Sequence, residues 1–511
     1  MTMRPTIQHV DGSLPYNTDQ TIQAIVAYDG ADVVRWSGGL YRIHVLKHDQ
    51  EGPVSRPKGS VVLVPVDGTH LVELATLAAS HLRWNARQKT TVDINCPRGV
   101  AEAILARGHW PEFPELTGII EAATLDLNGN EISAPGHHVK TGLYVATSGP
   151  LPKMKGLAGS AKGKQGIKVL LDFLRSFPFV SDADKSAALA LIMTALLRRL
   201  MPSAPMFAAT APSPGTGKTL LFELASIIAT GHRPAVLSMG ADEAEFSKRI
   251  HGALLAGDLM VLIDNVPPSR PIGNEDVLNQ LLSQPVLRVR ILGSSGMVTT
   301  LTNALVGATG NNLSVVGDGK RRTALIRLDA GLERPEQREF DGDILADALS
   351  RRDELIRGAL EISKSYFEAG CPKVDAKPYG SFADWDRMVR RPLIWHGLAD
   401  PLLASEGLRD QDPDMECMRA LFAAWHVEWR NIDVTASEVC KAGVARISEI
   451  GPCQNPELYD ALQLACSEKI NSRRLGYWLR GHRDRILDGM QLVQAGGNSD
   501  KKVATWRVVK L

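Results

Sequence analysis

This sequence of 511 residues is poor in cysteine and lacks a long apolar run. Its six cysteines form no C-x-x-C pair and no Cys/His group at zinc spacing, so we expect reduced, buried thiols and no structural zinc site. The longest apolar run, Ala187 to Leu197, is well short of the roughly 20 residues that a membrane-spanning helix needs. The N-terminus has no apolar signal-peptide core. These absences favour a cytoplasmic protein without a membrane partner.

Neither sign of charge is in excess. The chain has 58 Lys and Arg against 57 Asp and Glu, a net charge of +1, so contact with nucleic acid must come from local patches. The N-terminal region has no D-x-D acid pair with a partner histidine, which argues against a primase and assigns priming to a separate polypeptide. With 44% hydrophobic and 23% charged residues, the composition is that of a globular protein with several domains.

The pattern changes several times along the chain. In the N-terminal part, β-like runs alternate with amphipathic stretches that predict helices over 69–84 and 99–110. The stretch 148–166 is rich in Gly, Pro and Lys and lacks acids, which favours a linker, with contact to a nucleic-acid backbone as the alternative. The predicted regions are an N-terminal α+β domain at 1–147, a linker at 148–166, an ATPase domain with leading helices at 167–330, a helical region at 331–430 and a C-terminal unit at 431–511.

Strands and helices alternate through the middle of the chain. Ser181 is a predicted N-cap ahead of a buried helix, and the apolar strands MFAAT, PAVLSM and DLMVLIDN are separated by helical stretches, the first of which ends at Gly231. This rhythm predicts an α/β domain with a parallel sheet covered by helices.

The segment PSPGTGKT, residues 212–219, matches the end of the phosphate-loop pattern G-x-x-x-x-G-K-[ST], with Pro212 in the place of the first glycine. The proline lies in the ascending arm, and the residues after it retain the backbone N–H groups that hold phosphate oxygens. We expect Lys218 to neutralise the β- and γ-phosphates of ATP and Thr219 to bind Mg²⁺. The predicted nucleotide-binding residues are Gly215, Thr216, Gly217, Lys218, Thr219 and Leu220.

An acid and an amide follow two later apolar strands. Asp264 ends the run LMVLI and is predicted to hold Mg²⁺ with Thr219, while Asn265 is expected to orient water and either Asp264 or Glu245 to act as base. Asn311, with Asn312 behind it, ends a second buried strand and is predicted to polarise the attacking water.

The segment GDGKRR precedes a further strand. Its paired arginines, Arg321 and Arg322, stand where a neighbouring subunit could insert one of them to stabilise charge on the γ-phosphate. Which of the two would do so stays open at the sequence level.

Together, PSPGTGKT, VLIDN, ATGNN and GDGKRR resemble the superfamily 3 and related AAA+ helicases of phages and mobile elements, and more specifically the helicase half of prophage-type primase-helicases. The likeness covers roughly residues 165–330. It implies Walker A roles for Lys218 and Thr219, a Walker B role for Asp264, sensor 1 for Asn311 and a trans-acting finger at Arg321 or Arg322. It also implies a hexameric ring that translocates on single-stranded DNA.

Two segments are candidates for DNA contact. Arg288 and Arg290 alternate along a predicted hairpin around Gly293–Gly296, which either lines a pore or is a basic surface hairpin. The C-terminal unit reads as a winged helix that binds duplex DNA or docks a protein. Its predicted DNA contacts are Arg473, Arg474, Lys501 and Lys502.

The sequence thus predicts an ATP-dependent DNA helicase for replication of a phage or integrated element. Its expected fold is a P-loop NTPase core between an N-terminal α+β domain and a C-terminal helical and winged-helix part. The alternatives are a nucleotide-dependent replication initiator and an AAA+ loader or remodeller without processive unwinding.

Overall fold

The computed structural model of the chain describes residues 4–29, 32–48, 61–147, 158–290, 297–338, 342–410, 413–446, 453–466, 469–495 and 504–511. These residues divide into two compact units, Met1–Ser405 and Glu406–Leu511. The predicted helical region 331–430 is therefore split between the two units, and the predicted N-terminal and ATPase domains share the first. Among the described residues, no helix is both long and apolar enough to cross a membrane.

The core of the first unit is a five-stranded parallel sheet in the order β13-β14-β17-β12-β18. Strands β12, β14, β17 and β18 are almost entirely buried because their residues are largely apolar on both faces, as the sequence predicts, whereas the edge strand β13 is partly exposed. This is a mixed α/β arrangement consistent with a Rossmann-like or P-loop-like core. The strands are β12 (Met206–Ala211), β13 (Val236–Leu237), β14 (Met260–Ile263), β17 (Leu305–Asn311) and β18 (Thr323–Arg327).

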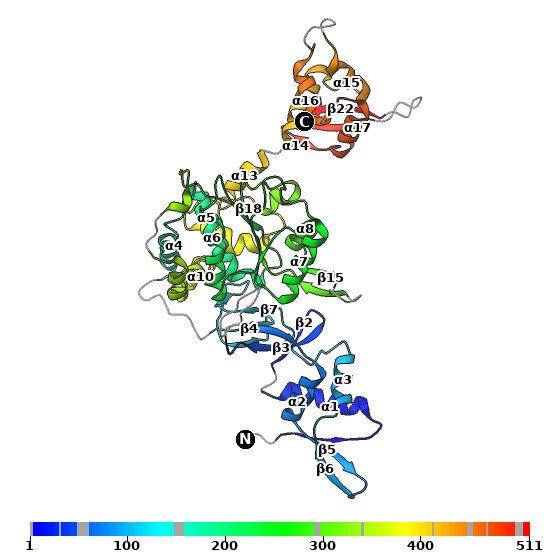
Figure 1. Cartoon of the computed structure of the whole chain (residues 1–511). Helices are drawn as coiled ribbons and strands as arrows, with labels where there is room; N and C mark the ends of the chain where they lie inside the picture. Colours follow the sequence, from blue (N-terminus) through cyan, green and yellow to red (C-terminus); the bar gives the residue numbers. More distant parts are fainter. Residues whose placement is uncertain are drawn as a thin grey trace. The chain divides into compact units, whose positions relative to one another are not determined.

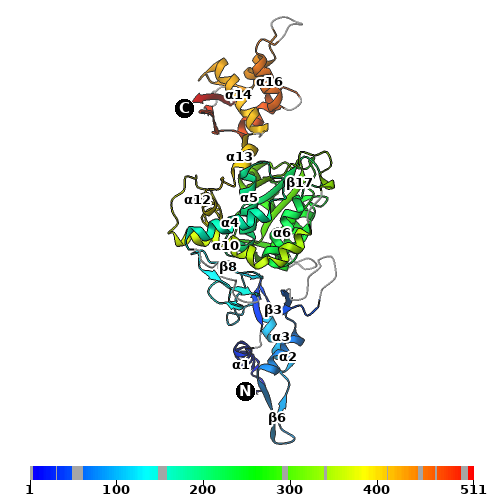
Figure 2. The ribbon, with the colours of Figure 1, turned by 90° about the vertical axis from the view of Figure 1, so that its left-hand side faces the viewer.

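Helices pack on this sheet in two successive layers (Figures 1 and 2). Helix α5 (Asp182–Leu197) and helix α6 (Lys218–Thr230) contact the strands, and α4 (Ser160–Phe173) and α10 (Arg352–Glu368) pack against them. The Ser181 hydroxyl accepts a hydrogen bond from the Asp184 amide, so the predicted N-cap of α5 is confirmed. The remaining helical elements are α7 (Glu243–Ala256), α8 (Asp276–Ser283), α9 (Ile344–Ser350), α11 (Ala383–Trp385), α12 (Arg391–Trp395), α13 (Leu403–Asp410), and the short turns η1 (Arg198–Leu200), η2 (Gly317–Arg322), η3 (Pro335–Gln337) and η4 (Asp386–Arg390).

Helix α4 corrects the predicted linker. Residues 160–166 are helical, and Gly163 and Gly166 are buried on the face that α10 covers. A Cβ atom on Gly166 would overlap the carbonyl oxygen of Gly358 in α10. The glycines of this stretch therefore allow two helix backbones to approach closely, and the linker prediction is wrong for 160–166. Residues 148–157 lie outside the described residues.

The N-terminal region consists of α1–α3 and small sheets. Three of these sheets have the orders β1-β5-β6, β2-β3-β4 and β10-β11-β7, and β8 pairs with β9. The predicted helix over 69–84 ends early, because residues from Ser80 onward form a strand that pairs with β1 and β6. The elements are β1 (Thr6–His9), α1 (Leu14–Ala27), β2 (Val33–Trp36), β3 (Gly39–Val45), β4 (Val61–Pro65), α2 (Gly68–Ala78), β5 (Ser80–Asn85), β6 (Thr90–Ile94), α3 (Arg98–Ala106), β7 (Gly118–Ile120), β8 (Thr124–Leu125), β9 (Glu131–Ile132), β10 (Gly136–His138) and β11 (Leu143–Val145).

The later part of this region is bonded directly to the α/β core. The Thr117 carbonyl accepts a hydrogen bond from Asn303 Nδ2 at 2.7 Å, and Thr124 Oγ1 donates to the Leu196 carbonyl at 2.7 Å. Glu131 pairs with Arg357 of α10 at 2.8 Å. These buried polar contacts explain why residues up to 147 and the core form one unit.

The second unit is built around a four-stranded antiparallel sheet in the order β19-β22-β21-β20. Its helices pack together around Leu458, Leu475 and Trp506. The elements are α14 (Pro413–Trp429), β19 (Val434–Thr435), α15 (Ala436–Val444), α16 (Pro456–Cys466), α17 (Ser472–Gly481), β20 (Ile486–Leu487), β21 (Met490–Ala495) and β22 (Thr505–Lys510).

Candidate functional site

The loop between β12 and α6 has the conformation that an anion-binding turn requires. Gly215 and Gly217 have φ angles of +76° and +95°, which favour glycine because a Cβ atom is strained there. Gly217 is the N-cap of α6 and has no side chain to bond the first amides of the helix. Those amides and the positive end of the helix dipole are therefore directed into the loop.

Lys218 lies at the centre of the loop. Its Nζ donates to Asn311 Oδ1 at 2.7 Å, to the Ser213 carbonyl at 3.1 Å and to Thr216 Oγ1 at 3.2 Å. Burial lowers the pKa of Lys218, while the charge of Asp264 acts in the opposite direction. The structure therefore brings the predicted phosphate-binding lysine and the predicted water-polarising amide into contact.

Asp264 accepts hydrogen bonds from two hydroxyl groups on the same oxygen. Thr219 Oγ1 donates to Asp264 Oδ1 at 2.9 Å, and Thr309 Oγ1 donates to that atom as well. The sequence did not identify Thr309, a buried residue of β17. The sequence feature that could have identified Thr309 is its position two residues before Asn311, because residues two apart in a strand have side chains on the same face.

Strand order explains this convergence. β17 lies between β14 and β12, with Ile263 beside Ala308 and Ala211 beside Asn311. All three strands run in parallel, so the residues at their carboxyl ends meet at one edge of the sheet, which is where ligands bind in open α/β sheets.

Within the described part of the chain, three other predicted residues contribute no side-chain hydrogen bond to this group. Asn265 and Asn312 are exposed and have positive φ angles of 56° and 46°. Glu245 pairs with Lys248 at 2.7 Å on the first turns of α7. The base assignment at Asp264 or Glu245 remains a prediction.

The two candidate finger residues differ in exposure. Both pair with Asp318, Arg321 Nη2 at 2.9 Å and Arg322 Nη2 at 2.6 Å. Although burial acts to raise the pKa of Asp318, the hydrogen bond from Arg321 and the charge of Arg322 hold that pKa below its usual value. The Arg322 side chain is 10% exposed and that of Arg321 is 52% exposed, so only Arg321 presents its guanidinium broadly to solvent.

A cleft of about 890 Å³ opens beside the loop, a volume within the range of small-molecule sites. Three segments far apart in the sequence form it, so sequence patterns could not reveal it. Arg338 Nη2 donates to the Ser176 carbonyl at 2.6 Å and joins two of its walls. The lining residues are Asp172, Phe173, Arg175, Ser176, Phe177, Gly215, Thr216, Gly217, Leu220, Arg338, Gly342, Asp343, Ile344, Leu345, Asp347 and Arg351.

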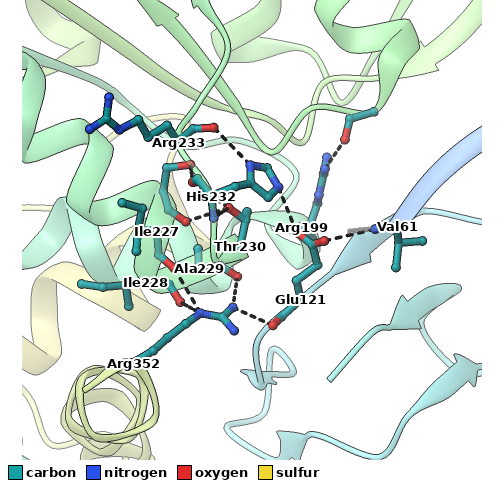
Figure 3. A network of polar contacts seen from close by, with 12 residues as sticks. Val61, Glu121, Arg199, Ile227, Ile228, Ala229, Thr230, His232, Arg233 and Arg352 are labelled. Atoms are coloured by element: carbon teal, nitrogen blue, oxygen red, sulfur yellow. Dashed lines mark hydrogen bonds and ion pairs between the residues drawn. The ribbon is translucent and has the colours of Figure 1, made fainter. Parts of the chain in front are cut away.

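The far end of α6 is held by a network of polar contacts (Figure 3). Arg352 donates to the carbonyls of Ile227, Ile228 and Ala229 in the last turn of α6 and, at 2.6 Å, to the Glu121 carbonyl. Glu121 Oε2 in turn lies 3.2 Å from His232 Nε2. Burial lowers the pKa of Arg352, opposed by the charges of Glu121 and Asp353. A cation at the C-terminal end of a helix satisfies its last carbonyls and complements its dipole.

The predicted basic hairpin is present as β15 (Val286–Arg290) and β16 (Met297–Leu301). Arg288 and Arg290 lie on its exposed face, whereas Leu287 and Val289 are buried. Ser37 Oγ, in the turn between β2 and β3, donates to Thr300 Oγ1 at 3.0 Å and so contacts the base of the hairpin. The predicted tip, Gly293–Gly296, lies outside the described residues.

The predicted C-terminal DNA contacts are only partly described. Arg473 and Arg474 lie on exposed positions of α17. Arg474 donates to the Cys466 carbonyl at 3.0 Å, and the Arg473 guanidinium lies 6.0 Å from the centre of the Tyr477 ring. Lys501 and Lys502 lie outside the described residues.

No protein-family model matches the chain, and no curated protein matches it. Among solved structures, it is similar to an apo structure (A form) of the NrS-1 C-terminal region with a TM-score of 0.40 and 11% identity over 86% of this chain and 99% of that chain. A second apo structure of the same region has a TM-score of 0.36 and 11% identity over 88% of this chain and 100% of that one. Similarity at this level does not identify a function.

Proposed function

We propose that the chain is an ATPase of the P-loop type, and that the Lys218–Asn311 and Thr219–Asp264 contacts form its reaction centre. These two hydrogen bonds, at 2.7 and 2.9 Å, are the observation on which the proposal rests. They join a loop lysine, a hydroxyl, a carboxylate and an amide, the set of groups that phosphoryl transfer from a nucleotide uses.

Each group has a defined role in this proposal. When nucleotide binds, Lys218 Nζ exchanges its hydrogen bond with Asn311 for contacts with the β- and γ-phosphates, and it neutralises their charge. The Thr219 hydroxyl and the Asp264 carboxylate hold Mg²⁺, which supplies charge stabilisation to the phosphates. The Asn311 amide orients the attacking water, and the glycine-loop amides bind the β-phosphate. The adjoining cleft accommodates the nucleoside.

We further propose that hydrolysis drives movement along DNA, as in the helicases that the motifs resemble. The exposed arginines of the β15–β16 hairpin supply phosphate contacts, and Arg321 completes the site of a neighbouring subunit in a homo-hexameric ring. In the second unit, α15–α17 followed by the strands β20–β22 supports a winged-helix interpretation with duplex DNA as its partner.

The test compares Lys218→Ala with the wild-type chain for Mg²⁺-dependent ATP hydrolysis, with and without single-stranded DNA. We expect turnover to fall by at least about 10²-fold in the variant, because the charge aimed at the phosphates is lost. Lys185→Ala, an exposed lysine in the first turn of α5, is the matched control. Wild-type turnover in Lys218→Ala contradicts the ATPase proposal, whereas hydrolysis without unwinding of a forked DNA supports the initiator or loader alternatives.

A further inference from the structure

Among the described residues of the N-terminal region, helices pack on one face of the sheet β1-β5-β6. Ile7, His9 and His81 are buried on the face that packs against α1 and α2. His9 and His81 are stacked there and share a hydrogen bond of 2.7 Å. Because side chains alternate along strands, the residues between them point to the opposite face.

That opposite face carries an exposed tryptophan. The strand register places Gln8 beside Leu82 and pairs Trp84 with Thr91. Trp84 is 55% exposed to solvent. A solvent-exposed tryptophan is typical of a binding surface, because binding of a partner would remove a large apolar area from water.

The turn of the same hairpin carries cations. Arg87 and Lys89 are exposed in the turn between β5 and β6, which lies at the end of the hairpin away from α1–α3 (Figure 1). Other arginines of this region have acid partners within the described residues: Arg83 with Asp11, Arg98 with Glu102 and Arg107 with Asp19. In the same described part of the chain, Arg87 and Lys89 have no such side-chain partner.

We propose that this face binds single-stranded nucleic acid, with a base stacked on Trp84 and the backbone phosphates beside Arg87 and Lys89. Single strands offer unstacked base faces, which an aromatic side chain on an open sheet can bind, together with a polyanionic backbone that complements the cations. Asp93 lies on the same face, opposite Leu82, so the phosphates are expected at the turn and not beside this carboxylate. The proposal does not depend on the nucleotide site.

The experiment measures binding of the full chain to fluorescently labelled oligo(dT) by anisotropy, without nucleotide. We expect Trp84→Ala to weaken binding by about 5- to 30-fold, since one stacked base is lost, and Trp84→Phe to retain most of the affinity. Arg87→Ala with Lys89→Ala should lower the slope of log affinity against log salt by about one to two. Arg98→Ala, an exposed arginine on α3, is the matched control and should leave affinity unchanged.

Each variant is measured with Arg288 and Arg290 both intact and both replaced by alanine, which separates this surface from the β15–β16 hairpin. Unchanged affinity in Trp84→Ala on both backgrounds overturns the proposal. If Trp84→Ala loses self-association while its affinity for oligo(dT) is unchanged, the face binds a second copy of the chain. That result also overturns the proposal. If Arg98→Ala weakens binding of oligo(dT) as much as the turn variant does, the loss of affinity reflects overall charge and not this face. That result would also overturn the proposal.

Discussion

Single residues at the carboxyl edge of the sheet hold one another in place. Asp264 is oriented by hydroxyls from Thr219 and Thr309, and Lys218 is drawn to Asn311. Because these side chains come from β17, from the residue that follows β14 and from the start of α6, the sheet and its first helix set their separations. Rigid support of this kind is what positions groups for phosphoryl transfer.

The arginines next to β18 give a prediction at this scale. Arg321→Ala is expected to keep wild-type thermal stability and ATP binding while lowering turnover by about 10³-fold or more, because its exposed charge acts on the transition state of a neighbour. Arg322→Ala is expected to lower the melting temperature, since it removes a nearly buried partner of Asp318. Turnover and melting curves measured on both variants separate these roles. Full turnover in Arg321→Ala would rule out that residue as the finger.

Among the structural elements, the strands were the easiest to predict. β12, β14, β17 and β18 are short, largely apolar and buried runs, and α6 ends before Gly231 as expected. The sequence predicts a helix at Ser80–Asn85 because these residues continue an amphipathic pattern, and only pairing with the distant β1 makes β5 a strand. Thr309 and the cleft depend on long-range neighbours in the same way, so local patterns could not show them.

The contact between α4 and α10 gives a stability prediction. Gly166→Ala is expected to lower the melting temperature by several degrees, because the added methyl group meets the Gly358 backbone and costs about 1–3 kcal/mol. Gly252→Ala is the matched control in the same unit: it lies in α7, where nothing stands within 4 Å of the new Cβ, and should raise stability slightly. Scanning calorimetry of the two variants tests this pair. A Gly166→Ala protein as stable as the control would contradict the close approach.

The β15–β16 hairpin supplies a functional prediction. Replacing Arg288 and Arg290 together by alanine is expected to remove stimulation of ATP hydrolysis by single-stranded DNA and to abolish unwinding at moderate salt, because both charges face solvent and would meet phosphates. The double change to lysine keeps the charge and should retain most of the stimulation. DNA-stimulated turnover in the alanine variant equal to that of the wild type would assign the hairpin another role.

For the whole molecule, the ring proposal predicts rescue between two inactive proteins. Lys218→Ala breaks its own nucleotide site and keeps its finger, while Arg321→Ala does the reverse. Mixed subunits should therefore recover a fraction of wild-type ATPase at interfaces that join an intact site to an intact arginine. Native mass spectrometry establishes that subunits have exchanged. Exchange without any recovery would contradict a shared site.

The side-chain pairs of Glu121 with His232 and of Glu131 with Arg357 also decide where genes of this kind can recombine. A crossover at the glycine-rich stretch near residue 148 would combine an N-terminal part from one parent with a core from another, and His232 and Arg357 would lose matched side-chain partners. Arg357 is buried, and a buried arginine tolerates such a loss poorly. A crossover near Ser405 divides the chain between its two compact units. Shuffled libraries should therefore yield folded chimaeras mainly from junctions at that second position, and the inherited module is the whole of the first unit.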